Sequence, residues 1–142
     1  MSGLIQLNIS DVEFLAFFLA QEFLKWGEPI PEFNSRYPDR LESCLQVPFQ
    51  SFGGHSPYPT PIDKASILFY LMNKSHPFQN GNKRIAMTTL MVFLYKNNLW
   101  LTVDENVFYR FARDIAASEA QQKDQTVNLI KMFLTKRCRP LT

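Results

Sequence analysis

Nine consecutive residues near the middle of the chain have the types and spacing of a phosphate-binding site. They are His76, Pro77, Phe78, Gln79, Asn80, Gly81, Asn82, Lys83 and Arg84. An apolar stretch follows, so Asn82, Lys83 and Arg84 are expected in the first turn of a helix, where backbone N–H groups point outward with the positive end of the dipole. Gly81 lets the backbone approach a ligand closely. This arrangement favours the binding of a polyphosphate.

The side chains of this stretch fit the same chemistry. Arg84 can grip phosphate oxygens in a two-pronged geometry, and Lys83 adds a compact charge. His76 can turn back over the site as a general base near neutral pH. A plainer interpretation stays open at this point, namely a loop histidine followed by solvated cations. The helix dipole opposes Lys83 and Arg84 by only roughly 0.3 kcal/mol each, too little to decide between the two.

The same nine residues resemble the signature of the Fic/Doc family, His-x-Phe-x-acid-(Gly/Ala)-Asn-(Gly/Lys)-Arg, and the lysine resembles the death-on-curing (Doc) branch. The resemblance extends to the segment 39–45, which contains Leu-Glu-Ser, and to Phe52-Gly53-Gly54. It covers most of the chain. It implies an all-α, Fic-type helical bundle around a central buried helix.

The resemblance also implies an activity, the transfer of a phosphate-containing group from a nucleoside triphosphate to a hydroxyl of a target protein. His76 would take the proton from that hydroxyl. Gly81 and Asn82 would cradle the phosphates, while Lys83 and Arg84 would neutralise the charge that develops on them. The Doc branch implies protein phosphorylation, with elongation factor Tu as a target. The alternative is transfer of AMP, as in many Fic proteins.

Two further parts of the chain take roles from the resemblance. Phe78 would anchor the loop in the core, and Phe52, Gly53 and Gly54 would form a flap that docks the target segment. The family's autoinhibitory string, Ser/Thr-x-x-x-Glu-(Gly/Asn), has no counterpart here. The sequence therefore predicts that inhibition comes from a separate antitoxin, as in a toxin–antitoxin pair.

Two departures from the family pattern affect the expected chemistry. Asn80 stands where an acid usually holds Mg²⁺, and an amide oxygen is a weaker, neutral ligand for this cation. Mg²⁺ with ATP, or with another nucleoside triphosphate, would then be held chiefly by the phosphates. A catalytically impaired nucleotide- or protein-binding module is a further alternative, and whether Asn80 is natural or introduced stays open. Met87 replaces the second arginine of AMP-transferring members, which favours phosphorylation.

Capping signals and apolar periodicity predict the elements that must position these residues. A Ser-x-x-Glu capping box at Ser10 predicts the first helix, with Leu15, Phe18 and Leu19 in its apolar stripe. A second capping box at Thr102 predicts a later one. The predicted helices span 11–26, 39–46, 61–74, 82–96, 103–117 and 124–136, with a loop over 28–38 and a small β-hairpin at 50–58.

Length and composition set the remaining expectations. A chain of 142 residues, 46% of them hydrophobic, predicts a single Fic/Doc domain over 1–142. A formal net charge of +2 disfavours a nucleic-acid partner, so a DNA-binding helical domain ranks low. No secretory signal and no membrane-spanning apolar run is visible, which predicts a cytoplasmic protein without membrane contact. Cys44 is expected to be buried.

Overall fold

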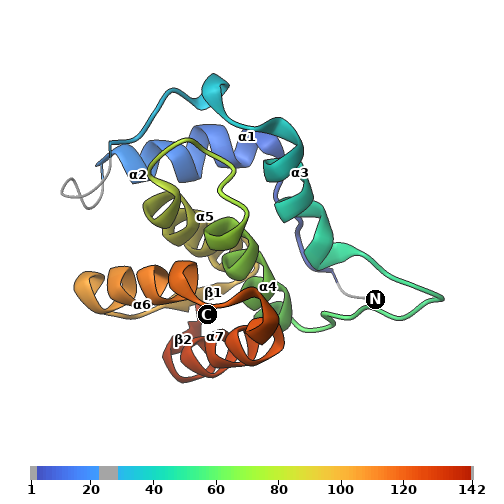
Figure 1. The fold of residues 1–142 in the computed structure, drawn as a ribbon. Helices are drawn as coiled ribbons and strands as arrows, with labels where there is room; N and C mark the ends of the chain where they lie inside the picture. Colours follow the sequence, from blue (N-terminus) through green and yellow to red (C-terminus); the bar gives the residue numbers. More distant parts are fainter. Residues whose placement is uncertain (1–2, 23–28, 142) are drawn as a thin grey trace.

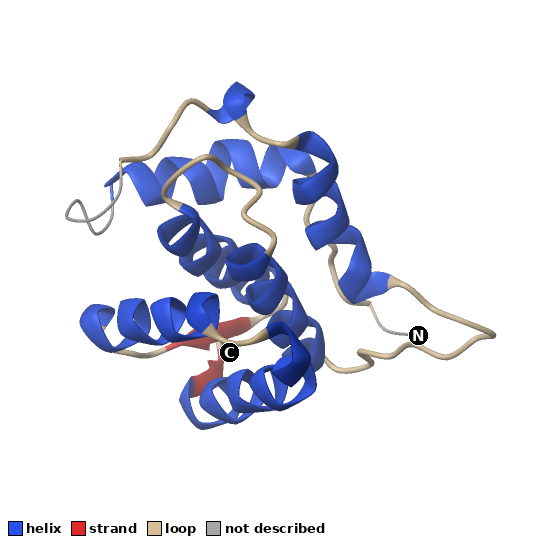
Figure 2. Ribbon diagram, in the orientation of Figure 1, coloured by secondary structure: helices blue, strands red, loops and turns tan. Residues whose placement is uncertain are grey.

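The computed structural model of the protein describes residues 3–22 and 29–141. The described chain is mostly helical, which confirms the predicted all-α class (Figures 1 and 2). The elements in chain order are α1 (Ile9–Asp11), η1 (Val12–Phe17), α2 (Phe18–Glu22), η2 (Phe33–Ser35), α3 (Pro38–Gln46), η3 (Val47–Phe49), α4 (Pro61–Lys74), α5 (Asn82–Lys96), β1 (Leu99–Leu101), α6 (Glu105–Ala117), η4 (Ala120–Gln122), α7 (Lys123–Arg137) and β2 (Cys138–Pro140).

Helix α5 forms the centre of the fold, as its nearly unbroken apolar sequence predicts. It contacts η1 and α2 on one side and α4, α6 and β1 elsewhere. Eleven of its 15 residues are buried, so neighbouring elements surround it on most of its faces. The hydroxyl of Thr88 donates a 2.7 Å hydrogen bond to the Ala16 carbonyl, which ties α5 to the wide, π-helical stretch η1.

Helix α4 packs between α5 and the C-terminal helices α6 and α7. Aromatic side chains fill these contacts. The Phe69 ring stacks on Phe108 with centroids 5.6 Å apart, and Phe111 stacks on Phe133 at 4.0 Å. Phe69 and Phe108 are almost fully buried, so the C-terminal helices share a core with α4.

The first helix starts two residues earlier than predicted. Asn8 is its N-cap, because its side chain accepts from the Asp11 N–H while the Asp11 carboxylate accepts from the Asn8 N–H. The apolar stripe was also predicted wrongly. The buried face is Val12, Ala16, Phe17 and Ala20, whereas Leu15, Phe18 and Leu19 are exposed. Part of the predicted C-terminal end, residues 23–26, lies outside the described residues.

Helix α6 starts two residues later than predicted. Asp104 is the N-cap, and its carboxylate accepts from the Asn106 and Val107 N–H groups. The Thr102 N–H instead donates to the Arg137 carbonyl next to β2. Thr102 therefore extends the small sheet, and Asp104 caps the helix in its place.

Two strands of three residues, β1 and β2, form an antiparallel sheet that the sequence pattern did not predict (Figure 2). Trp100 pairs with Arg139 at the middle of the register. The predicted hairpin at 50–58 is a tight turn closed by one isolated bridge, in which Phe52 and His55 exchange backbone hydrogen bonds of 2.8 and 3.0 Å.

Within residues 3–22 and 29–141, no helix has both the length and the apolar character required to cross a membrane.

Candidate functional site

The nine-residue stretch forms the loop between α4 and α5 and the first turn of α5. His76 follows the end of α4 and is exposed. Its φ of +48° lies in the left-handed region, which a non-glycine residue adopts only when its surroundings hold it there. The backbone therefore turns sharply at the predicted base and leaves its side chain accessible to solvent.

Phe78 anchors the loop in the core, as the resemblance implied. Its side chain is 1% exposed. Its ring lies 5.5 Å from Phe17 and 5.9 Å from Phe33, measured between centroids. Phe17 and Phe33 also touch one another edge to face, at 5.3 Å. Three rings from different segments thus fix the middle of the loop.

The Asn82 side chain bonds to the backbone of Phe78 and so closes residues 78–82 into a tight turn. Its side-chain oxygen accepts from the Phe78 N–H at 2.9 Å, and its side-chain nitrogen donates to the Phe78 carbonyl at 2.8 Å. Both bonds are buried, so they are worth more than the same bonds in water. The side-chain oxygen and one side-chain N–H of Asn82 are thereby committed to the loop. A phosphate could be contacted by its backbone N–H or by the second N–H of its amide.

Gly81 is the N-cap of α5 and lies in the left-handed region with a φ of +72°. It provides no side-chain acceptor for the first-turn N–H groups, which suits a helix N-terminus that binds an anion. A Cβ built on Gly81 would lie 2.5 Å from Cδ1 of Ile30 and 3.3 Å from the Pro29 carbonyl oxygen. The left-handed backbone conformation therefore favours glycine here, and a Cβ would also force the end of the Ile30 side chain to move and crowd the Pro29 carbonyl.

The two cations differ in exposure. Lys83 is half-buried, whereas Arg84 is only 6% exposed. A phosphate at the loop surface can therefore reach Lys83 more readily, and would meet Arg84 only at its remaining exposed edge. The positive end of the α5 dipole adds to both charges.

Two residues of the α3 region hold the backbone of the loop and were not predicted. The Tyr37 N–H donates to the Pro77 carbonyl at 2.8 Å, and Nη1 of Arg40 donates to the His76 carbonyl at 3.3 Å. The Arg40 guanidinium also lies over the Tyr37 ring, 4.3 Å from its centroid. No local sequence signal marks these contacts, because they join residues far apart in the chain.

The described residues around the loop do not form a cation site of their own. Asn80, the predicted weak ligand, is exposed on the loop. Within the described part of the chain, no group of three or more His, Cys, Asp or Glu side chains could hold a metal ion. Mg²⁺ usually takes one or two carboxylates together with substrate phosphates. The loop, residues 76–84, contains no such carboxylate, so a cation here would be held chiefly by the substrate phosphates.

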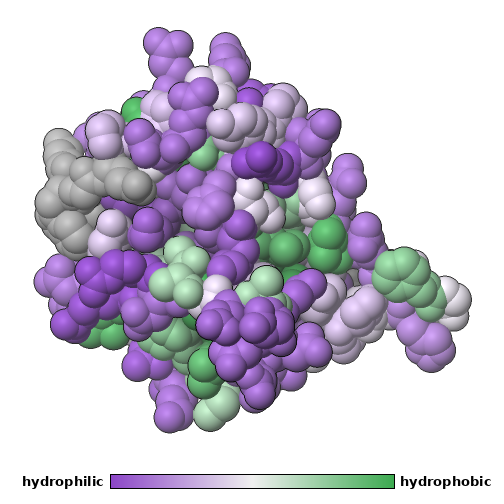
Figure 3. Space-filling model, in the orientation of Figure 1, coloured by the Kyte–Doolittle hydropathy of each residue, from purple (hydrophilic) through white to green (hydrophobic). Residues whose placement is uncertain are grey.

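The predicted flap does not lie beside the loop. Residues 48–58, which we call the arm, join the C-terminal end of α3 to the N-terminal end of α4, whereas His76 follows the other end of α4. Helix α4 has 14 residues, so it is about 21 Å long at 1.5 Å per residue. The arm projects from the body on the right of Figures 1 and 3, and Phe52 at its turn is 65% exposed.

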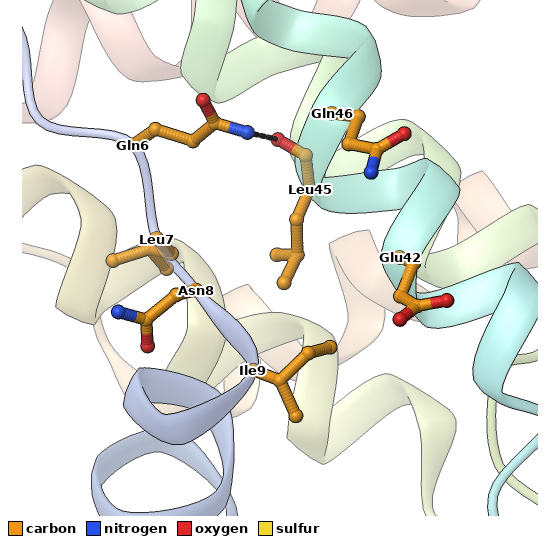
Figure 4. A pocket seen from close by; sticks show the side chains of 7 residues that line it. All are labelled: Gln6, Leu7, Asn8, Ile9, Glu42, Leu45 and Gln46. Carbon is orange, nitrogen blue, oxygen red and sulfur yellow. Dashed lines mark hydrogen bonds between the residues drawn. The ribbon is translucent and has the colours of Figure 1, made fainter.

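A separate cleft of about 340 Å³ lies between residues 6–9 and the later part of α3 (Figure 4). The side-chain amide of Gln6 donates to the Leu45 carbonyl across it at 3.1 Å. Glu42 contributes a carboxylate, and the described lining residues contain no cation. This cleft does not include the loop and does not suit an anion.

Cys44 is buried, as predicted, and its thiol is unreactive. Burial raises the pKa of its thiol to about 11, although a hydrogen bond with Ser75 opposes this rise. The thiol is protonated at neutral pH, and only a thiolate is a good nucleophile. Cys44 therefore supports the packing of α3 beneath Ser75 and takes no part in chemistry at the loop.

The geometry is that of a helical protein whose central helix has Gly81 as its N-cap and Lys83 and Arg84 in its first turn, next to an exposed histidine. A family model, that of the Fic/DOC family, matches residues 6–94. The match covers more than half of the 142 residues and includes the whole α4–α5 loop. The chain belongs to the Fic/DOC family, whose members are typically transferases that move a nucleotide-derived group onto proteins. No curated protein and no solved structure matches the chain.

Proposed function

We propose that this chain is a Doc-like toxin that phosphorylates a hydroxyl of a target protein. The α4–α5 loop is the observation that supports this most. It joins an exposed His76 to the N-terminus of α5. Phe78 fixes its middle in the core, and Asn82 at its end bonds back to Phe78. Such rigidity is what phosphoryl transfer needs, because its catalysis rests on positioning and charge stabilisation. Met87, in place of an arginine, favours phosphorylation over AMP transfer.

The proposed step uses the loop residues in the roles that the resemblance assigns. The target hydroxyl oxygen bonds to the γ-phosphorus of ATP while the bond from this phosphorus to the bridging oxygen breaks. His76 takes the hydroxyl proton, and the nucleoside diphosphate leaves. The N–H groups at the start of α5, together with Lys83 and Arg84, stabilise the charge that develops on the phosphate oxygens.

Mg²⁺ is proposed as the companion of the nucleotide. It would neutralise phosphate charge when bound. Its ligands would be chiefly the triphosphate oxygens, with the side-chain oxygen of Asn80 as a weak, neutral addition. This neutral ligand is also the feature that favours the second candidate, an impaired binding module.

The proposed partners are the protein substrate and a separate antitoxin. Elongation factor Tu is the candidate substrate that the resemblance offers. Because the arm and His76 lie at opposite ends of α4, a target that touches both would have to lie along this helix. Phe52, Gly53 and Gly54 would then dock the target at a distance from the modified hydroxyl.

The test is a transfer assay with the purified chain, its Asn80→Asp and His76→Ala variants, a bacterial lysate, Mg²⁺ and ATP labelled at either the α- or the γ-phosphate. We expect a lysate protein to acquire label from the γ-position only, more label with Asn80→Asp, and none with His76→Ala. Label from the α-position would identify an AMP transferase instead. No label with either the wild-type chain or Asn80→Asp would support the binding module, and an unchanged rate with His76→Ala would overturn the proposed chemistry.

A further inference from the structure

Lys64 is a buried cation whose side-chain hydrogen bonds, among the described residues, all go to the arm. It lies near the start of α4 and is 5% exposed. Its ammonium donates to the Pro48 carbonyl at 2.9 Å and to the Tyr58 carbonyl at 2.7 Å. These two carbonyls stand at the two ends of the arm. One side chain therefore holds both ends.

Two further contacts complete the surroundings of this ammonium. Ser56 Oγ lies 3.5 Å from Nζ and accepts a weaker bond, and the Phe49 ring lies beneath the charge with its centroid 4.6 Å away. Both residues belong to the arm. Burial lowers the pKa of Lys64, while the charge of neighbouring Asp63 acts in the opposite direction. A buried charge is tolerated only where it has partners, and here the arm supplies them.

At the ends of the arm, Phe49 and Tyr58 also pack against the core, and the Phe49 ring lies 6.2 Å from the Phe93 ring of α5. Between these ends, the described residues of the arm have few contacts that fix its direction. Its own pairing is the single bridge between Phe52 and His55. An isolated two-stranded turn is marginally stable in water even when it has a full ladder of hydrogen bonds. The direction in which the arm leaves the body is therefore set at its two ends.

We propose that Lys64 is a positioning residue that fixes the arm and thereby sets the affinity for the protein target. The second half of this statement rests on the proposed function, since it requires that the target docks on the arm. Lys64 lies at the end of α4 remote from His76, so its loss should change recognition of the target and leave the chemical step and nucleotide binding unaffected.

The first experiment measures the arm directly, by hydrogen exchange of its backbone N–H groups in Lys64→Met. Methionine keeps an unbranched apolar stem and removes the donors. The Phe52 and His55 N–H groups should exchange at least about tenfold faster, with no change in α5. Lys74→Met is the matched control, because Lys74 lies on the same helix and donates to the Ala116 and Ser118 carbonyls instead. It should leave exchange in the arm unchanged.

Unchanged exchange in the arm of Lys64→Met would overturn the proposal. If this variant does not fold, Lys64→Arg takes its place. Arginine keeps the charge, but its planar fork cannot reproduce the geometry of a compact ammonium. An arm that exchanges at least about threefold faster would then support the proposal, and an unchanged arm would overturn it.

The second experiment uses the protein that the transfer assay labels. For Lys64→Met we expect the KM for this protein to rise at least about tenfold, with kcat and the KM for ATP within about twofold of wild type. A lower kcat with an unchanged KM for the target would overturn the role in docking. If neither the wild-type chain nor Asn80→Asp labels a protein, the proposed function fails, while the exchange experiment still tests whether Lys64 holds the arm.

Discussion

Two residues of the α4–α5 loop lie in the left-handed region of backbone conformation. His76 has a φ of +48° and Gly81 a φ of +72°. For a residue with a side chain this region costs about 1–2 kcal/mol. The strain at His76 is held by bonds from Tyr37 and Arg40 to the carbonyls of the loop. At Gly81 the same geometry is free of strain, but the space beside its Cα is occupied by Ile30.

Gly81→Ala should therefore destabilise the fold by two effects, the left-handed φ and the contact with Ile30. We expect a loss of about 2–3 kcal/mol in the free energy of unfolding, measured by urea denaturation. Gly53→Ala is the control, since Gly53 has a φ of +58° and nothing within 4 Å of an added Cβ. It should show only the first effect. Adding Ile30→Val to Gly81→Ala should recover part of the loss, and equal losses in the two alanine variants would exclude a steric role of Ile30.

At this scale the sequence identifies the loop itself but not the contacts that hold it. The nine residues are contiguous, so their types and order can be compared directly with a family signature. The bond from Arg40 to His76 joins residues 36 positions apart. The contact of Ile30 with Gly81 likewise depends on how two segments pack. Such contacts leave no periodic or local trace, and so they appear only in three dimensions.

At the scale of elements, α4 combines several signals that reinforce one another. Thr60 is its N-cap and Pro61 its first residue. Asp63 accepts from the Thr60 N–H and hydroxyl, and it forms a 2.7 Å ion pair with Lys131 on α7. Burial alone would raise the pKa of Asp63, but the bonds from Lys131 and Thr60 outweigh it and leave the pKa below its usual value. The start of α4 is thus linked to α7 through one carboxylate.

This lowered pKa predicts the pH dependence of Asp63→Asn. A carboxyl whose pKa is lower in the folded state stabilises the fold above its unfolded pKa of about 3.9, and this stability is lost as the pH falls through the folded value. At about pH 7 the variant should be less stable than wild type by about 1 kcal/mol, as for the loss of a helix cap. The difference should shrink in urea denaturations below about pH 4.

Asp39→Asn provides the comparison for this prediction. Asp39 also lies in the first turn of a helix, α3, but it is exposed and Tyr37 is the N-cap there, without a side-chain cap bond. We expect its substitution to change stability by less than about 0.5 kcal/mol. If the difference in the free energy of unfolding between wild type and Asp63→Asn stays constant down to about pH 3, the assigned role of the carboxylate is contradicted.

The predicted boundaries are accurate where a single start signal exists and shifted where two compete. Residues 61–74 and 82–96 match α4 and α5 as predicted. The first helix offers two capping patterns, at Asn8 and at Ser10, and the structure uses the earlier one. In this helix Val12, Ala16 and Phe17 face the core. Which pattern is used depends on packing, and periodicity alone could not decide it.

At the scale of the whole molecule, the C-terminal part of the chain closes the core around α4 and α5. The family match ends at residue 94, yet α6 and α7 pack against α4. The sheet of β1 and β2 adds a second link, since it joins the exit of α5 to the end of α7. Its strands have three residues each and lie far apart in sequence, too short for an alternating pattern to show. The helical class was therefore predictable, whereas this closure was not.

The sequence predicts a single domain, and a pair of leucines on α7 can test that prediction. Leu134 is fully buried, whereas Leu129 on the same helix is 56% exposed. Leu134→Ala should lower the free energy of unfolding by about 2–5 kcal/mol through the cavity that it leaves, and Leu129→Ala should change it by less than about 0.5 kcal/mol.

Both variants should unfold in one transition by far-UV and near-UV circular dichroism, because a single cooperative unit loses helices and aromatic packing together. The aromatic stack of Phe69, Phe108 and Phe111 makes this comparison sensitive, since it spans α4 and α6. If α6 and α7 of the Leu134→Ala variant instead unfold in a separate, earlier transition, the C-terminal helices form a folding unit of their own. The proposed transfer activity should then survive the first transition, whereas in a single domain it should be lost together with the helices.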